Sequence, residues 1–421
     1  MTAGSDRSAQ HVRAMAEAAR GAARSLAAME AGRRDRALRE VARAIRAARA
    51  PILHANERDL ARASASPTAF RDRLALDPAR IEAMAHGLEA IAALPDPLAR
   101  DMGEWTRPNG LRIRRIPQPI GVIGMIYESR PNVGADAAGL CLKSGNAVIL
   151  RGGSESFESG RAIQHAVAAG LAAAGLPEAA VQSAPTAERA FVAAMLGAAG
   201  AIDLIVPRGG RALVERVARE ARMPVLAHAE GLCHTYVHRA ANAEMARRVV
   251  ANAKMRRPGV CGATETLLID AAIAPGLLGA IVSDLALLGC RFRADERARA
   301  LVPDLAPAAA EDFDTEWLDA VLSIAVVDDL EAALAHIARH GSSHTDAIIT
   351  EDREAAESFL KSVDSAVALW NASTQFCDGG EFGFGAEIGI ATGRVHARGP
   401  VGLEQLTTYR YLVLGTGQVR A

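Results

Sequence analysis

The stretch Gly121-Val122-Ile123-Gly124-Met125-Ile126-Tyr127 is a short, continuous apolar run. A second run, Asn146-Ala147-Val148-Ile149-Leu150, follows it, and a third spans residues 201–206. Helical patterns follow these runs, over residues 156–174 and again from Arg211. Because continuous apolar runs are typical of parallel strands buried on both faces, this alternation predicts a doubly wound α/β sheet.

The same alternation resumes further along the chain. Strand-like segments at residues 266–269, 323–327 and 347–350 alternate with helical patterns at residues 275–288 and 330–339. These segments predict a second α/β domain, with Cys261 near the hinge between the two domains. The first hundred residues are helical in pattern, and Leu38, Val41 and Ile45 form their clearest apolar stripe.

Two strand-like segments lie outside this rhythm. Residues 111–117 follow the turn Pro108-Asn109-Gly110, and residues 407–413 lie near the C-terminus. Edge strands of this kind can pair across subunits, so we predict an oligomerisation arm and a homo-oligomer. The expected domains are a cofactor-binding domain at residues 1–104 and 119–230, a catalytic domain at 231–365, and the arm at 105–118 and 395–421.

Composition excludes several classes of function. The 421 residues include 48 Lys and Arg and 49 Asp and Glu, for a net charge of −1. Such a balance favours neither a nucleic acid nor an anionic membrane as a partner. The N-terminus lacks an apolar signal segment, and charged residues, Pro and Gly interrupt the most apolar region, residues 271–290. Together with five scattered cysteines and no CxxC pair, these features predict a cytoplasmic protein with reduced thiols.

Cys261 is the candidate nucleophile. It follows Arg256-Arg257-Pro258-Gly259-Val260, where a helical pattern ends shortly before a strand-like one begins. Nearby cations and backbone N–H groups at such a junction favour the thiolate, although a thiol is more often a small buried hydrophobe. Burial accounts fully for Cys141 and Cys290, whereas Cys233 and Cys377 keep a smaller chance of a role in the site.

Other segments suggest anion or nucleotide binding. Glycines follow two of the predicted strands, in Pro207-Arg208-Gly209-Gly210 and in Leu150-Arg151-Gly152-Gly153-Ser154. Glycine lets a backbone approach a phosphate closely, and Arg151 could meet a ribose or a 2′-phosphate. The glycine-rich residues 378–402 contain Arg398, which could receive an anionic substrate. His340 and His344 are four apart, but Gly341 and two serines make a helix doubtful, so we predict no metal site.

Several motifs resemble those of the γ-glutamyl phosphate reductase (glutamate-5-semialdehyde dehydrogenase) family, a branch of the aldehyde dehydrogenase superfamily. The resemblance spans nearly the whole chain and rests on residues 127–133, 142–153, 206–210, 257–261, 340–346, 379–383 and 396–404. It implies an aldehyde-dehydrogenase-like α/β fold, with two doubly wound α/β domains plus a β-arm for oligomerisation.

The resemblance also implies a reaction, the NADPH-dependent reduction of L-glutamyl 5-phosphate to L-glutamate 5-semialdehyde in proline biosynthesis. Cys261 would form a thioacyl intermediate, and the substrate could be channelled from a glutamate kinase. By the same resemblance, the oxyanion is stabilised by the backbone of Cys261 and a side chain from Arg130 or Asn132. The expected cofactor contacts are Arg151, Gly152, Ser154, Pro207, Arg208, Gly209, Gly210 and Glu316. The expected substrate contacts are Ser129, His344 and Arg398.

Two positions depart from the family pattern. Gly262 stands where Asn is common, and Gln375 stands where Arg is frequent, which removes one possible anion contact. Neither change alters the thiol. Two alternative functions remain at this point: another acylating or oxidising aldehyde dehydrogenase of the superfamily, or a non-catalytic nucleotide-binding member.

Overall fold

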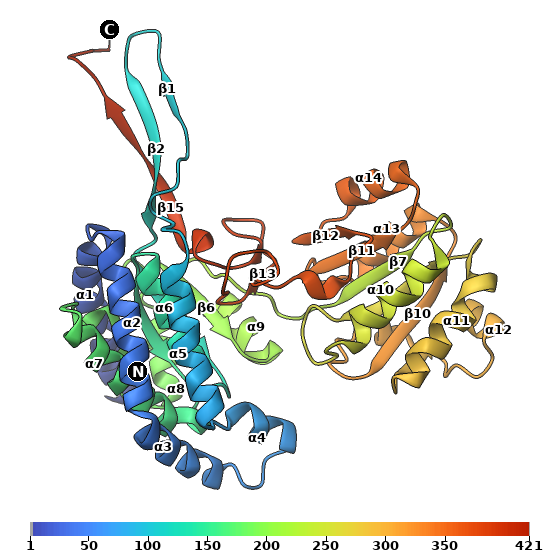
Figure 1. Ribbon diagram of the computed structural model, residues 1–421, viewed down its shortest axis with the longest axis horizontal. Helices are drawn as coiled ribbons and strands as arrows, with labels where there is room; N and C mark the ends of the chain where they lie inside the picture. Colours follow the sequence, from blue (N-terminus) through green and yellow to red (C-terminus); the bar gives the residue numbers. More distant parts are fainter. Residues whose placement is uncertain (1–2, 421) are drawn as a thin grey trace. The chain divides into compact units, whose positions relative to one another are not determined.

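The computed structural model describes residues 3–420 and, apart from residues 3–5 and 68–69, their side chains. The chain divides into two compact units (Figure 1). Unit 1 contains the chain up to Ala227 together with Gly383–Gly389 and the residues from Val401 onward. Unit 2 contains His228–Phe382 and Ile390–Pro400. Within the described residues, no helix combines the length and apolarity that crossing a membrane requires.

Unit 1 is built on a four-stranded parallel sheet in the order β5-β4-β3-β6. The predicted apolar runs form three of these strands, and each of the three is almost entirely buried. The strands are β3 (Val122–Tyr127), β4 (Ala147–Arg151), β5 (Val181–Ser183) and β6 (Leu204–Arg208). The sheet therefore confirms the predicted parallel α/β layer.

Helices surround this sheet. The apolar stripe of α2 (Leu38, Val41, Ile45) is fully buried, and α2 packs against α5, α6 and α7. Helix α1 packs against α8 and also lies close to strands β3 and β4. The bounds are α1 (Ala3–Ala27), α2 (Ala31–Ala47), α3 (Arg49–Arg62), α4 (Thr68–Leu74), α5 (Pro78–Ala93), α6 (Val133–Lys143), α7 (Phe157–Ala173), α8 (Arg189–Leu196) and α9 (Arg211–Glu220).

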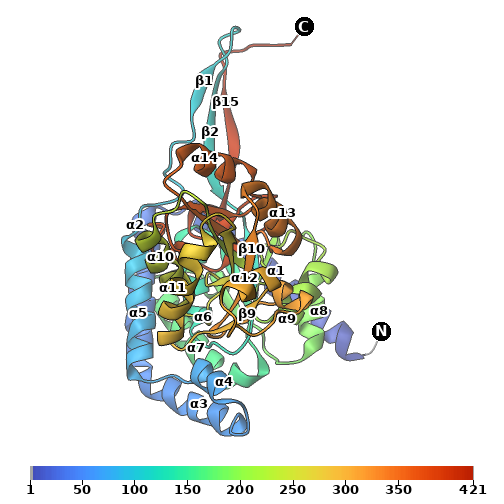
Figure 2. The ribbon, with the colours of Figure 1, turned by 90° about the vertical axis from the view of Figure 1, so that its right-hand side faces the viewer.

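A three-stranded antiparallel arm extends from unit 1 (Figures 1 and 2). It contains β1 (Glu104–Thr106), β2 (Arg112–Pro119) and β15 (Thr407–Leu414), in the order β1-β2-β15. Both segments that the sequence sets outside the α/β rhythm therefore form strands of one sheet. Trp105 and Tyr411 are exposed on this arm, and their ring centroids lie 6.0 Å apart.

Unit 2 contains a six-stranded parallel sheet in the order β12-β11-β7-β8-β10-β9. Successive residues of β8 alternate between two apolar cores, since Leu267 and Ile269 belong to one and Leu268 to the other. Helices α10 to α12 pack on the first face, and α13 and α14 pack on the second. The strands are β7 (Cys233–Val237), β8 (Thr264–Asp270), β9 (Arg291–Ala294), β10 (Val321–Val327), β11 (Thr345–Ile349) and β12 (Val367–Trp370). The helices are α10 (Ala243–Met255), α11 (Ala274–Leu287), α12 (Glu296–Leu301), α13 (Leu330–His340) and α14 (Arg353–Ser362).

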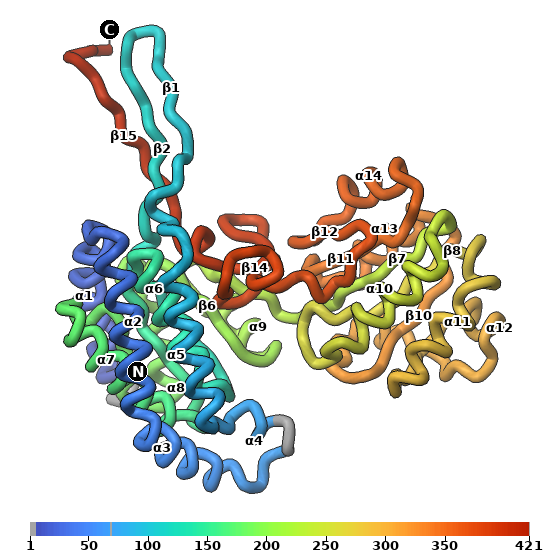
Figure 3. The backbone as a smooth tube through the Cα atoms, viewed as in Figure 1, coloured from blue at the N-terminus to red at the C-terminus, as the bar shows by residue number. Residues whose placement is uncertain are grey.

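The unit boundary differs from the expected division in two places. Unit 2 begins at His228 rather than at residue 231, and Nδ1 of His228 hydrogen bonds at 2.9 Å to the carbonyl of Ile390, another residue of unit 2. Residues 395–400, expected with the arm, also belong to unit 2. There β14 (Gly399–Pro400) pairs with β13 (Ile390–Ala391), and Arg398 bonds to Asp364. The backbone trace of Figure 3 shows this stretch as an irregular path that leads to β15.

Gly170 tests the packing of α7 on α2. A Cβ at Gly170 would lie 2.5 Å from Cα of Val41, whereas a Cβ at Gly21, in α1, would meet nothing within 4 Å. We expect Gly170→Ala to destabilise the protein by about 2–3 kcal/mol, because two helix backbones must separate. Thermal unfolding would then shift down by about 2–4 °C. Gly21→Ala is the matched control and should stabilise by about 0.5–1 kcal/mol. Equal effects of the two substitutions would contradict this account of the contact.

Candidate active site

Cys261 lies in the loop that joins α10 to β8 in unit 2. The residue is partly exposed, unlike the other four cysteines, which are buried. The residue packs against the small cluster of Val367, Cys377 and Ile390 but is not fully enclosed, as the candidate nucleophile requires. Burial instead raises the pKa of Cys141 well above its usual value and the pKa of Cys290 to about 11. Both side chains therefore stay protonated thiols.

A buried ion pair holds the two ends of this loop together. Lys254 lies in the last turn of α10 and Glu265 near the start of β8, and Nζ of Lys254 is 2.5 Å from Oε2 of Glu265. Both side chains are at most 1% exposed. The backbone N–H of Leu318 also donates to Glu265 at 3.2 Å. Burial raises the pKa of Glu265 to about 7, and the ammonium of Lys254 opposes that rise.

The parallel sheet brings other polar groups to the same edge. Strands β11, β7 and β8 are neighbours, and His344, Cys233 and Cys261 lie at or just before their amino ends. Because neighbouring parallel strands start at the same edge, residues far apart in the sequence meet there. The site thus lies at the amino-terminal edge of the sheet of unit 2, whereas ligands of open α/β sheets usually bind at the carboxyl edge.

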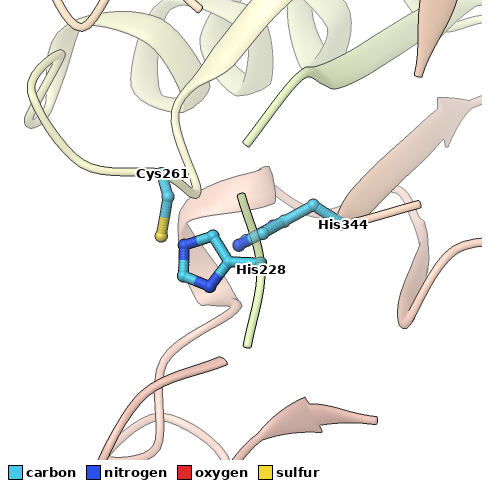
Figure 4. Close-up of side chains that lie close together, drawn as sticks. All are labelled: His228, Cys261 and His344. Carbon is cyan, nitrogen blue, oxygen red and sulfur yellow. The ribbon is translucent and has the colours of Figure 1, made fainter. Parts of the chain in front are cut away.

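Two imidazoles approach the Cys261 sulfur (Figure 4). One nitrogen of His228, one nitrogen of His344 and the sulfur all lie within 4.8 Å of one another. The two rings meet edge to face, with centroids 5.0 Å apart. His228 is partly exposed, and the carbonyl of Ile390 accepts the hydrogen bond from its Nδ1 at 2.9 Å. His344 is fully buried.

His344 is held as a neutral ring. Burial, followed by the nearby His228, lowers the pKa of His344 to about 3. Its Nδ1 lies 2.9 Å from Oγ1 of Thr345 and 3.5 Å from the sulfur of Cys233. The thiol of Cys233 in turn donates to the carbonyl of Cys261 at 3.1 Å. Burial raises the pKa of Cys233 well above its usual value, so it supports the loop as a thiol rather than as a second nucleophile.

Glu316 contacts the same loop indirectly. It accepts a hydrogen bond from the backbone N–H of Gly231 at 2.9 Å, and burial raises its pKa. A Cβ at Gly231 would lie 2.1 Å from the carbonyl oxygen of Cys261, so only glycine fits there. Arg398, an expected substrate contact, is paired with Asp364 at 3.0 Å.

The two departures from the family pattern lie against this loop. Gln375 is buried, and its amide donates to the carbonyl of Ala253 at 3.0 Å, which ties the end of α10. A Cβ at Gly262 would lie 3.3 Å from the carbonyl oxygen of Thr374, at the start of η4 (Thr374–Phe376). Both residues therefore shape the backbone around Cys261.

The other expected catalytic and substrate residues belong to unit 1. Asn132 precedes α6, and its side chain donates to Asp136 at 3.1 Å. Ser129 has a positive φ of 52°, and its N–H and hydroxyl both donate to Glu155, at 2.6 and 3.1 Å. Arg130 is exposed. Within a unit, the structure therefore brings only His344 of these predicted residues to Cys261.

Some of the residues expected to contact the nucleotide already hydrogen bond to other groups of the chain. Arg151 is buried, and its terminal nitrogens donate to the carbonyls of Gly152 and Ala187 at 2.9 and 2.6 Å. Gly210 precedes α9, but its N–H donates to the carboxylate of Glu128 at 3.0 Å. Pro207 is buried at the end of β6, Arg208 is half-buried, and Gly209 is exposed.

A shallow hollow with a cavity volume of about 20 Å³ lies beside these segments in unit 1. It lies at the carboxyl ends of β3, β4 and β5, where parallel α/β sheets usually bind ligands. Gly152 lines it, and Ser154 begins the adjoining turn η1 (Ser154–Ser156). Arg161, an exposed cation on α7, lines it as well.

Sequence reasoning missed His228, Lys254, Glu265 and Arg161 as parts of these sites, whereas it left a smaller chance of a site role for Cys233. A signal existed for Lys254 and Glu265, since opposite charges flank the Cys261 loop within otherwise apolar segments. Local sequence gives no such signal for His228, because its position depends on the hydrogen bond to Ile390, 162 residues away.

Comparisons with known proteins agree with this geometry. Residues 2–298 match the model of the aldehyde dehydrogenase family. The chain is 70% identical over 409 residues to a γ-glutamyl phosphate reductase of Acidiphilium cryptum, covering 97% of each chain. The crystal structure of a γ-glutamyl phosphate reductase from Thermotoga maritima superposes with a TM-score of 0.95 at 40% identity, covering 97% of this chain and 100% of that one.

A more distant structure shows the fold alone. An engineered glycolyl-CoA reductase with bound NADP+ has a TM-score of 0.67 at 16% identity, and 96% of each chain is covered. The predicted aldehyde-dehydrogenase-like fold is thus confirmed. With an accessible cysteine loop, this fold and 70% identity to a named relative, the chain belongs to the aldehyde dehydrogenase family, in its γ-glutamyl phosphate reductase branch.

Proposed function

We propose that the protein reduces L-glutamyl 5-phosphate to L-glutamate 5-semialdehyde and phosphate, with NADPH as the reductant, as a step of proline biosynthesis. Unit 2 would be the catalytic domain and unit 1 the cofactor-binding domain. The observation that carries the proposal is the partly exposed residue Cys261 beside two imidazoles, in a chain 70% identical to a γ-glutamyl phosphate reductase. We further propose a cytoplasmic location and a homo-oligomer that pairs through the arm.

Cys261 would act as the nucleophile. Its sulfur attacks the acyl carbon, the C–O bond to phosphate breaks, and a thioacyl enzyme forms. Two imidazole nitrogens lie within 4.8 Å of the sulfur, and His228 would be the base that takes the proton from the thiol, because the low pKa of His344 makes that ring too weak a base. The backbone N–H of Cys261 would stabilise the oxyanion, with Asn132 or Arg130 as the expected side-chain donor.

A bound nicotinamide would supply the hydride that converts the thioester to the aldehyde level. Members of the aldehyde dehydrogenase family use nicotinamide cofactors. The adenosine end of the cofactor would bind in the hollow lined by Gly152 and Arg161. The end of β6 is less suitable, because the N–H of Gly210 already donates a hydrogen bond to the carboxylate of Glu128. We propose that Arg161 meets the 2′-phosphate of NADPH, because a guanidinium binds phosphate in a bidentate manner.

Replacement of the thiol tests the nucleophile. We expect Cys261→Ala to lower phosphate-dependent oxidation of the semialdehyde by at least ~10³-fold, because the covalent route is lost. NADPH binding, followed by fluorescence, should persist in this variant. Cys290→Ala, which removes a buried thiol of the same unit, is the control and should retain activity. Unchanged turnover in Cys261→Ala would end the assignment, and turnover with CoA but not with phosphate would favour an acylating aldehyde dehydrogenase.

Arg161 tests the cofactor preference. We expect Arg161→Ala to raise KM for NADPH by about 10-fold while KM for NADH changes little, since only NADPH carries the 2′-phosphate. Steady-state kinetics with both cofactors measures the split. Arg33→Ala, another exposed arginine of unit 1, should change neither value. Parallel losses with NADPH and NADH would show that Arg161 does not read the 2′-phosphate.

Substitution of Lys254 tests the buried ion pair between Lys254 and Glu265 at the two ends of the Cys261 loop. We expect Lys254→Met to cost about 3–5 kcal/mol of unfolding free energy, because it leaves Glu265 buried without its cation. The pKa of Glu265 is higher in the folded protein than in the unfolded chain. Its protonated form is therefore compatible with the fold at low pH, and the fold becomes less stable as the pH rises through the folded pKa and the carboxyl ionises. The loss should therefore be larger at about pH 9 than at about pH 6. Lys361→Met, at an exposed lysine, is the matched control, and equal losses would contradict the pairing.

A further inference from the structure

We propose that His228, Cys261 and His344 form a binding site for a thiophilic divalent cation, with Zn²⁺ as the best match. Occupation of this site would make the thiol unavailable, so the metal would act as a reversible inhibitor. The binding goes beyond the proposed reaction and does not depend on it. The inhibition rests on the proposed function.

The ligand set suits this class of metal. One sulfur and two imidazole nitrogens lie within 4.8 Å of one another, and the three residues converge on one space (Figure 4). Thiolate and imidazole are the ligands that Zn²⁺ prefers, whereas Mg²⁺ and Ca²⁺ require oxygen ligands. A tetrahedral zinc with bonds of about 2.0–2.3 Å needs its ligand atoms roughly 3.3–3.7 Å apart. Side-chain movements of about 1 Å would achieve that spacing.

The hydrogen bonds of both histidines leave Nε2 as the ligand atom. Nδ1 of His228 donates to the carbonyl of Ile390, which places the lone pair of that ring on Nε2. Figure 4 shows a ring nitrogen of His228 turned toward the sulfur. A backbone carbonyl behind a histidine is the usual support of a metal ligand, because it fixes both the tautomer and the ring orientation.

His344 supplies an independent indication. Its side chain is fully buried, and its Nε2 has no hydrogen-bond partner among the described residues. Its Nδ1 is engaged by Thr345 and Cys233, so the ring is held in place from behind. A buried polar atom without a hydrogen-bond partner destabilises the fold, and a metal ion bound to that nitrogen would remove this cost. This pattern is expected of a ligand rather than of a ring that only fills space.

Three protein ligands would leave a fourth position open. Zinc sites of this kind hold water or an oxygen ligand there. His340 does not contribute, since it pairs with Asp314, so the pair of histidines four residues apart that the sequence contains is not the metal site. The site depends instead on three segments, residues 228, 261 and 344, that only the folded sheet brings together.

The test is a metal titration of the full-length protein without substrate. We expect Zn²⁺ to bind with one site per chain by calorimetry, and Co²⁺ to give a thiolate charge-transfer band. Loss of one ligand should weaken Zn²⁺ binding by more than ~100-fold in Cys261→Ser, His228→Gln and His344→Gln, because even outer-shell partners of metal ligands are worth 10–100-fold. Cys377→Ala, at a neighbouring buried thiol, is the control and should keep the affinity. Mg²⁺ should give no binding.

The outcomes separate the two proposals. His228 is partly exposed, so His228→Gln should fold even if substitution of buried His344 disturbs the structure. Unchanged Zn²⁺ affinity in Cys261→Ser and His228→Gln, or no saturable binding at all, would overturn the site. Zinc binding without reductase activity would refute the proposed function and leave the site standing. Reductase activity that zinc does not inhibit, despite binding through Cys261, would refute the inhibitory role.

Discussion

The parallel pairing of β11, β7 and β8 is the constraint on which the candidate active site depends. Asp346 lies beside His234, and Cys233 lies beside Thr264, so the three strands begin at one edge of the sheet. Residues at or just before the starts of these strands therefore converge, although His344 is 111 positions from Cys233 in the chain. A shift of register by one residue would turn the flanking side chains to the opposite face and separate them.

The side chains around the Cys261 sulfur are either uncharged or paired with an opposite charge. His344 is uncharged because it is buried, Cys233 stays a thiol, and the charges of Lys254 and Glu265 oppose each other beneath the loop. Cys261 thus lies on a loop whose neighbouring side chains are mostly hydrogen bonded or ion paired. Precise placement of a nucleophile requires such support, because small displacements of reacting atoms cost large factors in rate.

Much of this arrangement could be predicted from sequence. Apolar runs predicted three of the four strands in the parallel sheet of unit 1, but not β5. The turn at Asn109-Gly110 predicted the β1–β2 hairpin, and the junction after Pro258 indicated Cys261. Side-chain partners could not be predicted, because they depend on distant segments. Arg151 was expected to meet a cofactor, yet its terminal nitrogens donate to backbone carbonyls, and Glu128 occupies the N–H of Gly210. Local patterns encode elements, whereas these contacts arise from tertiary packing.

Cys261 lies at the amino-terminal edge of the sheet in unit 2, and the carboxyl-terminal edge of the same sheet has no role in the proposed reaction. The connections that leave β8, β10 and β11 there, at residues 271–273, 328–329 and 350–352, lie one strand length from the sulfur. Strands of five to seven residues span roughly 16–23 Å at ~3.3 Å per residue. A fluorescent reporter or an affinity tag grafted into one of these connections would thus be remote from the thiol, so the fold offers an attachment point separate from its chemistry.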